Sequence, residues 1–217
     1  MFNFSQIPIT ISLIAANVIL SLIAFSNAEF MDKGVMWPYR VARERQYFRF
    51  VTSGFLHADL MHLIFNMFTL FYFGGDIERA FTEKHLGGDV AYLSLYFLAL
   101  IISDIPTYLK YKNVYGYRSL GASGAVSAIV FAVVVLNPWK SIYLYGAFAL
   151  SATVFAVLYV IYSITMSKRR VDNINHDAHL WGCVFGLVFT VALIYFMQPQ
   201  LFDQLLENLK HPSLFGD

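Results

Sequence analysis

Charged residues are scarce in this sequence. Only 13% of its 217 residues are Asp, Glu, Lys or Arg, whereas 58% are hydrophobic. An ordinary soluble domain is about half apolar and about one quarter charged, so the composition excludes that class. Windows of about 20 mostly apolar residues recur, and each is long enough to cross a hydrocarbon core about 30 Å thick. We therefore predict an integral, multi-pass membrane protein.

Cysteine and net charge are also in short supply. The single cysteine, Cys183, cannot form a disulfide within the chain, which excludes a disulfide framework. The formal net charge of +1 provides no field that would attract a polyanion, so we expect no nucleic-acid partner. No basic residue precedes the first apolar segment, and we interpret this segment as a retained membrane span and not as a secretory signal.

Six hydrophobic segments are present, at residues 7–27, 58–74, 90–106, 121–137, 142–163 and 177–197. Open strands would leave backbone groups unpaired in lipid, and the segments are too long for barrel strands, so all six are predicted to be helices. Asp104 and Pro106 are expected to mark the end of the third helix. The predicted fold is an all-α bundle of six transmembrane helices over residues 1–199. A short C-terminal tail, residues 200–217, is expected to form a surface helix.

The connection between the first two segments, residues 28–57, is rich in aromatic and basic side chains. It contains Trp37, Tyr39, Arg40, Arg43, Arg45 and Arg49. Aromatic rings and guanidinium groups both suit the headgroup region of a membrane. We therefore predict that this first loop is structured and lies at the interface.

Polar side chains inside apolar segments are costly in lipid and are candidates for function. One cluster is HADLMHLIFNM, with His57 and Asp59 at the entrance of the second segment and His62 and Asn66 within it. His62 and Asn66 are four residues apart and share a helix face. Either residue alone could simply bridge two helices, but the pair on one face favours a functional site.

A second cluster, Gly121-Ala122-Ser123-Gly124, opens the fourth segment. Small residues alone usually indicate close packing of helices. Alternatively, the glycines let the backbone turn and expose Ser123 at a helix N-terminus, whose free N–H groups can bind a developing anion. The apolar run ends early, at Asn137. Ser123 is therefore predicted to lie below the membrane surface, in a water-filled depression.

The third cluster, NHDAHLWGCVFG, places His179 three residues before Gly182, with Gly186 one turn further. Two glycines spaced by four permit very close approach of another helix. If that helix is the one that begins at Ser123, the serine and the histidine meet.

A serine hydroxyl beside an imidazole is sufficient for nucleophilic catalysis. The imidazole takes the hydroxyl proton during attack and later delivers it to the leaving amine. Asp177 is the nearest carboxylate in sequence, but it lies about 200° round the helix from His179. We therefore predict a Ser123–His179 dyad and not a triad. His62, Asn66 and the Ser123 N–H are predicted to donate to the oxyanion.

Other interpretations remain open from the residues alone. His57, His62, His176 and His179 could bind zinc, but the sequence has no H-E-x-x-H motif and no cysteine pair, so we expect no metal and no other cofactor. A non-catalytic membrane chaperone or binding scaffold could use the same polar groups to hold transmembrane helices. A transporter of small polar solutes could use them to line a path.

Three motifs occur in the order and spacing of one known family. FRFVTSGFLHADLMHLIFN matches an aromatic-Arg pair followed by H-x4-H-x3-N, GASGAVSAI matches G-x-S-G, and AHLWGCVFG matches A-H-x2-G-x3-G. On these motifs the chain resembles the rhomboid intramembrane serine proteases over nearly its whole length, about residues 7 to 197.

The resemblance implies roles for particular residues. Ser123 becomes the nucleophile, His179 its general base, and His62 and Asn66 residues of the oxyanion hole. Gly121, Gly124, Gly182 and Gly186 become packing positions near the site, and Arg49 belongs to the structured first loop. The implied substrates are transmembrane proteins, cleaved in contact with membrane lipid without metal or nucleotide. The fifth helix would be a mobile gate that admits them.

The chain departs from the family pattern at two positions. The usual Trp-Arg pair is Phe48-Arg49 here. Many bacterial members carry a tyrosine four residues after the nucleophile, stacked on the histidine, whereas this chain has Ser127 there. The sequence therefore leaves open which residue orients His179, and Tyr117 is one nearby aromatic candidate.

The resemblance also implies an orientation, with a cytoplasmic N-terminus in a bacterial inner membrane. The charges disagree: of 15 lysines and arginines, all but Arg79, Lys84, Lys140 and Lys210 fall in the odd-numbered connections. The positive-inside rule would place those connections in the cytoplasm. We give the resemblance more weight, because much of this charge belongs to a loop that is predicted to fold at the interface.

Overall fold

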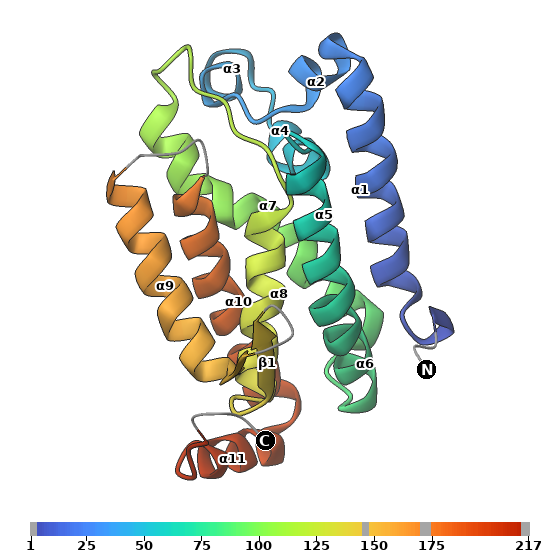
Figure 1. Cartoon of the computed structure of the whole chain (residues 1–217), viewed down its shortest axis with the longest axis vertical. Helices are drawn as coiled ribbons and strands as arrows, with labels where there is room; N and C mark the ends of the chain where they lie inside the picture. The colour runs from blue at the N-terminus through green and yellow to red at the C-terminus, as the bar shows by residue number, and fades with distance from the viewer. Residues whose placement is uncertain (1–3, 145–147, 170–174, 214–217) are drawn as a thin grey trace.

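The computed structural model describes residues 4–144, 148–169 and 175–213. Among these residues, four helices are long and apolar enough to cross a membrane: Pro8–Ser26 (α1), Leu60–Glu83, Gly88–Tyr111 (α7) and His176–Met197 (α10). Two shorter apolar helices, Ser123–Leu136 (α8) and Ala152–Arg169 (α9), lie in the same bundle (Figure 1). The predicted all-α membrane bundle is confirmed.

The second span is one long helix with a change of pitch in its middle. It consists of α5 (Leu60–Thr69), the π-helical turn η3 (Leu70–Gly74) and α6 (Gly75–Glu83). Asp59 caps its start, because the carboxylate accepts a hydrogen bond of 2.8 Å from the His62 N–H. The helix therefore continues well past the predicted end at residue 74.

The shortest membrane helix, α8, lies at the centre of the bundle (Figure 1). Every residue from Gly124 to Val133 is buried, as is Leu136. A helix that is apolar on all sides has to be surrounded by other helices, and here α7 and α10 pack against it. Fourteen residues give a length of about 21 Å. Since that length is less than a bilayer core, the N-terminus of α8 lies inside the bundle, below the loops.

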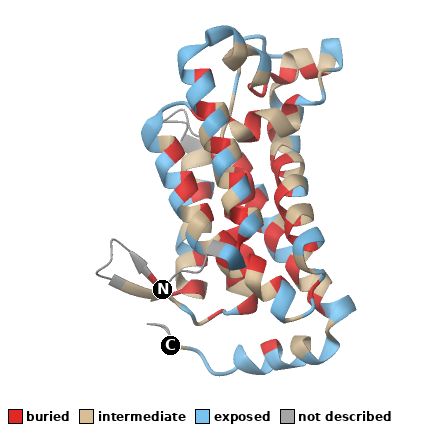
Figure 2. Ribbon diagram, turned by 90° about the vertical axis from the view of Figure 1, so that its right-hand side faces the viewer, coloured by how far each residue is buried: buried red, intermediate tan, exposed pale blue. Residues whose placement is uncertain are grey.

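The outer faces of the helices are apolar and exposed, as a lipid-facing surface requires. Figure 2 shows the buried residues gathered along the middle of the bundle and the exposed residues along its outside. Large exposed hydrophobic side chains occur on several helices, among them Ile19 and Leu22 on α1, Phe65 and Phe68 on α5, Leu158 and Ile161 on α9, and Leu187 and Val188 on α10.

Helix α1 is attached to the bundle by hydrogen bonds. Glu78 of α6 is 2% exposed, and its two carboxylate oxygens each accept a 2.8 Å hydrogen bond, from the backbone N–H groups of Ile9 and Thr10. These N–H groups belong to the first turn of α1, where no partner exists within the helix. The negative charge also suits a helix N-terminus. Glu78 thus caps a helix that is remote from it in sequence.

The first loop is structured, as predicted. It contains α2 (Ala28–Gly34), α3 (Pro38–Glu44), α4 (Arg49–Thr52) and the 3-10 turn η2 (Ser53–Phe55). A further 3-10 turn, η1 (Phe4–Gln6), precedes α1.

Arg49 holds this loop together from its inside. Its side chain is 1% exposed, and its guanidinium donates to the backbone carbonyls of Asp32 at 2.9 Å and Val35 at 2.6 Å. Burial lowers the pKa of Arg49, but the group keeps its charge because an arginine starts from so high a value.

A second set of contacts joins the first loop to the segment that leads into α8. Met36 and Ser119 exchange two backbone hydrogen bonds of 2.9 and 3.1 Å, and the Trp37 indole donates to the Tyr115 carbonyl at 2.8 Å. The guanidinium of Arg118 lies 3.6 Å from the centre of the Trp37 ring. The approach to Ser123 is therefore held by the first loop.

The predicted fifth span, residues 142–163, is wrong in its first part. Ser141–Leu144 (β1) pairs antiparallel with Phe148–Ser151 (β2), and residues 145–147 lie outside the described part of the chain. Helix α9 begins only at Ala152. The N–H of this residue donates to the Lys140 carbonyl at 2.9 Å. The hairpin is as apolar as the helix after it, so hydropathy alone does not reveal the turn.

The third predicted helix ends later than expected, and the C-terminal tail forms a helix of its own. Asp104 and Pro106 do not end the third helix, because α7 continues to Tyr111 with Pro106 inside it. A proline is tolerated there because neighbouring groups in a membrane bundle satisfy the freed backbone carbonyl. After α10 the tail forms α11 (Pro199–Asn208). The Trp139 indole donates to the Asn208 carbonyl at 2.7 Å, which fixes the end of α11.

Candidate active site

The closest packing in the bundle is between α8 and α10. A methyl group on Gly182 would lie 2.2 Å from the Gly124 carbonyl oxygen, and one on Gly186 would lie 2.1 Å from the Ala128 carbonyl oxygen. Both distances are far below van der Waals contact, so any side chain would force the helices apart. The backbone of α10 therefore lies directly on that of α8, as the spacing of the glycines predicts.

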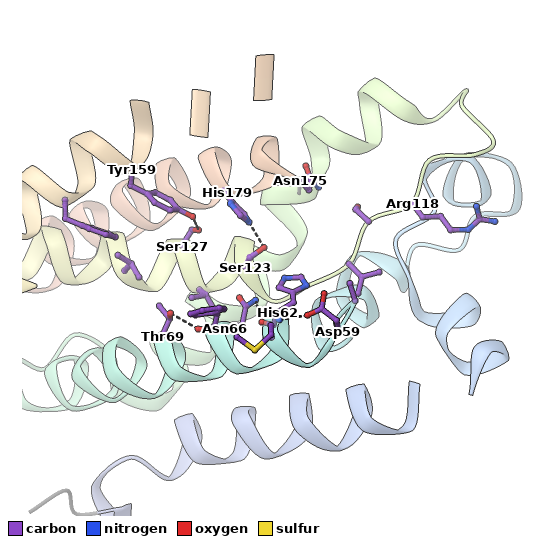
Figure 3. Close-up of a pocket in the computed structure, with 18 residues that line it drawn as sticks. Asp59, His62, Asn66, Thr69, Arg118, Ser123, Ser127, Tyr159, Asn175 and His179 are labelled. Carbon is purple, nitrogen blue, oxygen red and sulfur yellow. Dashed lines mark hydrogen bonds between the residues drawn. The ribbon is translucent and has the colours of Figure 1, made fainter. Parts of the chain in front are cut away.

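This packing brings Ser123 and His179 together. The His179 Nε2 atom lies 2.8 Å from the Ser123 Oγ atom, within hydrogen-bond distance (Figure 3). Ser123 is the first residue of α8, so its own N–H is among those left without a partner inside the helix. The hydroxyl thus has an imidazole on one side and free backbone donors beside it.

Asn175 fixes the start of α10, one turn before His179. Its side-chain oxygen accepts hydrogen bonds from the Ala178 N–H at 3.2 Å and from the Thr107 hydroxyl at 3.0 Å. Its amide nitrogen donates to Asp104 at 3.3 Å. Asn175 is not among the residues predicted for the site, although an asparagine directly before an apolar helix is a common N-cap signal. Through this cap α10 is hydrogen-bonded to α7, which fixes the position of His179 along the axis of the bundle.

The neighbours of His179 on α10 make further contacts between helices. The Asp177 carboxylate accepts hydrogen bonds from the Lys110 ammonium of α7 and from the Ser167 hydroxyl of α9. The ring of His176 lies edge-on to that of His179, with 5.6 Å between ring centres. These contacts hold the N-terminal turn of α10 against two other helices.

Ser123 and His179 face a cavity of about 710 Å³, a size that suits a ligand-binding pocket. Its walls come from α5, α8, α9 and α10 and from the segment that leads into α8 (Figure 3). Besides the Ser–His pair, the labelled residues that line it are Asp59, His62, Asn66, Thr69, Arg118, Ser127, Tyr159 and Asn175.

His62 and Asn66 lie across the cavity from His179, on α5. A methyl group on Gly121 would lie 2.9 Å from His62 Nε2 and 3.7 Å from Ser123 Oγ, so the imidazole and the hydroxyl flank this glycine. The Asn66 amide uses one N–H for the His62 carbonyl, at 3.0 Å, and has a second one. The structure therefore brings all four predicted polar residues to one cavity.

His57 belongs to the layer behind His62. It is fully buried, and its Nδ1 atom lies 2.9 Å from the Ser21 hydroxyl, which itself donates to the Phe55 carbonyl at 3.1 Å. Because the Ser21 proton is used, His57 Nδ1 is the donor of this pair. Burial lowers the pKa of His57 to about 3, so the ring is neutral at physiological pH. Its edge contact with His62, at 5.0 Å between ring centres, supports that ring.

The histidines do not assemble as metal ligands. Among the residues that the structure describes, no group of three or more His, Cys, Asp or Glu side chains could hold a metal ion. His57 and His62 form one pair, and His176 and His179 form another.

Tyr117 is one candidate from the sequence for the residue that orients His179. The Tyr117 ring stacks on Tyr111, with 3.7 Å between ring centres. A second aromatic ring, that of Tyr159 on α9, lies 6.3 Å from the His179 ring, with 20° between the ring planes. Nothing in the sequence distinguished Tyr159 from the lipid-facing aromatic residues of the same helix, because the rotation of α9 is set by its packing.

The chain belongs to the rhomboid family. The family's Rhomboid domain matches residues 44–196, which include the α8–α10 contact and the cavity. The resemblance noted in the sequence motifs is thereby confirmed, and it supports a protease of the intramembrane class.

Several characterised proteins are similar in sequence. The RHOMBOID-like protein 12, mitochondrial, of Arabidopsis thaliana is 26% identical over 196 residues, which is 86% of this chain and 58% of that protein. The RHOMBOID-like protein 6, mitochondrial, of the same plant is 30% identical over 81% of this chain and 52% of its own length. The Rhomboid protease GlpG of Photorhabdus laumondii is 29% identical over 57% of this chain and 40% of its own length.

The chain thus spans about half the length of these relatives. The apolar helices and the family support an integral membrane protein. The relatives include mitochondrial proteins of a plant as well as a bacterial protease. They do not support a bacterial inner membrane in particular.

Proposed function

We propose that this protein is an intramembrane serine endopeptidase that cleaves peptide bonds in or near the transmembrane segments of other membrane proteins. The observation that carries the proposal is the 2.8 Å contact between Ser123 Oγ and His179 Nε2, at a helix N-terminus that opens into a cavity within the bundle. The bundle of residues 1–199 would carry the activity, without metal, nucleotide or other cofactor.

The Ser–His pair supplies the chemistry in two steps. His179 Nε2 accepts the Ser123 proton while Oγ attacks the carbonyl carbon, and the same proton then passes to the leaving amine. The product of this step is an ester between Ser123 and the N-terminal fragment of the substrate. A water molecule, deprotonated by His179, hydrolyses the ester and restores the hydroxyl.

The oxyanion of each tetrahedral intermediate needs donors that are already in place. We expect three groups of the cavity to serve: the backbone N–H of Ser123, the His62 ring and the second N–H of the Asn66 amide. The first lies at the N-terminus of α8, where the helix dipole also favours negative charge. One such donor is worth about 10²–10³ in kcat in other proteases.

The substrate would enter between α5 and α9. Both helices line the cavity, α5 through Phe65 and Asn66 and α9 through Phe155 and Tyr159, and α8 lies between them (Figure 1). A transmembrane segment that unwinds here would present its backbone to Ser123. Helix α9 is the element that we expect to move as the gate.

The dyad is tested by removing each member. Ser123→Ala and His179→Ala are each expected to abolish cleavage of a model single-span substrate, because the nucleophile or its base is gone. Both variants should keep the thermal stability of the wild type in detergent, since each change removes only a few atoms at the cavity. Near-full activity of either variant would exclude the dyad.

The alternative of a non-catalytic chaperone or scaffold is tested by a covalent probe. A fluorophosphonate reacts with an activated serine, so wild-type protein should be labelled and Ser123→Ala should not. A scaffold would bind transmembrane helices without being labelled. A small-solute transporter would instead show flux that Ser123→Ala leaves unchanged.

A further inference from the structure

Tyr159 is joined to both members of the α8–α10 pair. Its hydroxyl lies 3.1 Å from the Ser127 hydroxyl of α8, and its ring packs on the His179 imidazole of α10. Tyr159 itself comes from α9. One side chain of the expected gate helix therefore contacts the helix of the nucleophile and the helix of the base (Figure 3).

Two contacts lie one helical turn apart on the same face of α8. Ser123 and Ser127 are one turn apart and share a face. Ser123 meets the imidazole of His179 at 2.8 Å, and Ser127 meets the phenol of Tyr159 at 3.1 Å. The two rings also contact each other. Together the four side chains therefore connect α8, α9 and α10.

The Tyr159 ring has a defined orientation. It is nearly parallel to His179, at 20°, and nearly parallel to Phe155, at 18° with 5.8 Å between ring centres. Offset-parallel rings at 4.5–7 Å attract one another. The hydrogen bond to Ser127 fixes the far end of the phenol, so the whole ring cannot swing away from the imidazole without losing that bond.

Rotation of the imidazole about the bond that carries it would move Nε2 away from Oγ. A flat side chain packed on the imidazole restricts that rotation. Small misplacements matter, because an error of about 1 Å in the position of a catalytic group can cost about 10²-fold in rate.

We propose that Tyr159 is the positioning residue of His179, and that Ser127 holds Tyr159 in place. This inference rests on the proposed function. It adds that the dyad is aligned only while α9 is seated on α8 and α10, because the aligning ring is carried by α9. An outward movement of α9 that admits a substrate removes the ring, and the return of α9 restores the alignment for the chemical step.

The test compares rates of fluorophosphonate labelling for the full chain in detergent. The probe is small and needs no transmembrane docking, so its rate reports on the dyad. Tyr159→Leu is expected to be labelled about 10- to 100-fold more slowly than wild type. Tyr159→Phe keeps the ring and loses only the hydroxyl, and it should be labelled about threefold more slowly than wild type. For a single-span substrate, kcat should fall in Tyr159→Leu while KM changes by less than about twofold.

Ser127→Ala tests the hydrogen bond separately. It removes the same bond as Tyr159→Phe, so the two variants should have similar rates, and the double variant should be no slower than either single variant. A double variant that shows the full product of both single effects would overturn the role of Ser127. This comparison uses conservative changes and does not depend on the folding of Tyr159→Leu.

Tyr162→Leu is the matched control. Tyr162 lies on α9 one turn from Tyr159, and its ring contacts His176, at 5.5 Å between ring centres. Its replacement should leave the labelling rate within about twofold of wild type. The proposal is wrong if Tyr159→Leu is labelled as fast as wild type, if Tyr162→Leu is equally slow, or if Tyr159→Leu changes KM alone. An unlabelled wild type would instead contradict the proposed function itself.

Discussion

At the scale of single residues, the site depends on the absence of a side chain at Gly121. This residue adopts φ +127°, a conformation that side chains disfavour. It also separates His62 from Ser123, since a methyl group here would lie 2.8 Å from the nearest atom of the His62 ring. The backbone N–H of Gly121 is used as well, because it donates to the Ser53 carbonyl at 3.0 Å.

Gly121→Ala is expected to reduce cleavage by about 10²-fold or more, because the methyl group displaces a proposed oxyanion donor. The strained backbone should lower stability by about 1–3 kcal/mol. Cleavage rate and thermal stability in detergent measure the two effects. Gly116→Ala is the control, since a methyl group there meets nothing within 4 Å. Equal activity of the two variants would show that the space beside His62 is not needed.

Only some of the contacts between individual residues could be predicted from the sequence. The meeting of Ser123 and His179 follows from glycine spacing, because helical periodicity places His179 on the same face as Gly182. Their catalytic roles stay predictions. Tyr159 and Glu78 were not foreseen, since each acts across a contact between remote segments. The partner of Tyr159 depends on how far α9 is rotated, and the partners of Glu78 lie 68 and 69 residues away.

At the scale of elements, the pairing of α8 with α10 determines the distance from nucleophile to base. The two helices touch through backbone atoms at Gly124 and Ala128. Without a hydrophobic force between helices in lipid, such close packing and interhelical hydrogen bonds supply the attraction. The same interface therefore stabilises the fold and sets the geometry of the site.

Gly186→Ala should separate the helices, because its methyl group would lie 2.1 Å from the Ala128 carbonyl oxygen. The expected cost is about 1–3 kcal/mol of stability, with a parallel loss of fluorophosphonate labelling as His179 moves. Thermal unfolding in detergent and the labelling rate are measured on the same sample. Stability and labelling equal to those of Gly116→Ala would contradict the backbone contact.

Element boundaries were harder to predict than element types. The β1–β2 hairpin has the same apolar composition as a membrane span, so residues 142–151 were assigned to the fifth helix. Pro106 was taken as a helix end, but α7 continues through it to Tyr111, since other groups of a membrane bundle can satisfy the freed carbonyl. Hydropathy identifies the segments that can be buried in lipid or in the core, but it does not identify their backbone conformation.

At the scale of the whole molecule, the N-terminus and α11 lie at one end of the bundle and the first loop at the other (Figure 1). The bundle, the family and the structured first loop were all predictable, because apolar segments and spaced motifs are properties of sequence. The orientation of the chain across the membrane was not predictable in this way, because the basic residues and the family resemblance indicate opposite orientations.

The orientation can be measured with introduced cysteines. Lys33 of α2 and Lys210, just beyond α11, have side chains that are 71% and 66% exposed, whereas Cys183 is 1% exposed. In intact cells an impermeant maleimide should label Lys33→Cys, and it should label Lys210→Cys only after permeabilisation. This result is expected if the N-terminus is cytoplasmic. The reverse pattern would favour the positive-inside count and place the active-site mouth on the cytoplasmic side.

The central position of α8 also has a consequence for biosynthesis. Helix α8 is shorter than the hydrocarbon core, and its backbone at Gly124 and Ala128 packs against α10, which is synthesised later. A nascent chain that has reached residue 169 already contains the serine but neither the histidine nor the helix that covers the serine's surroundings. The last span would complete both the fold and the dyad, so a ribosome-bound or truncated chain would have no proteolytic activity toward neighbouring membrane proteins.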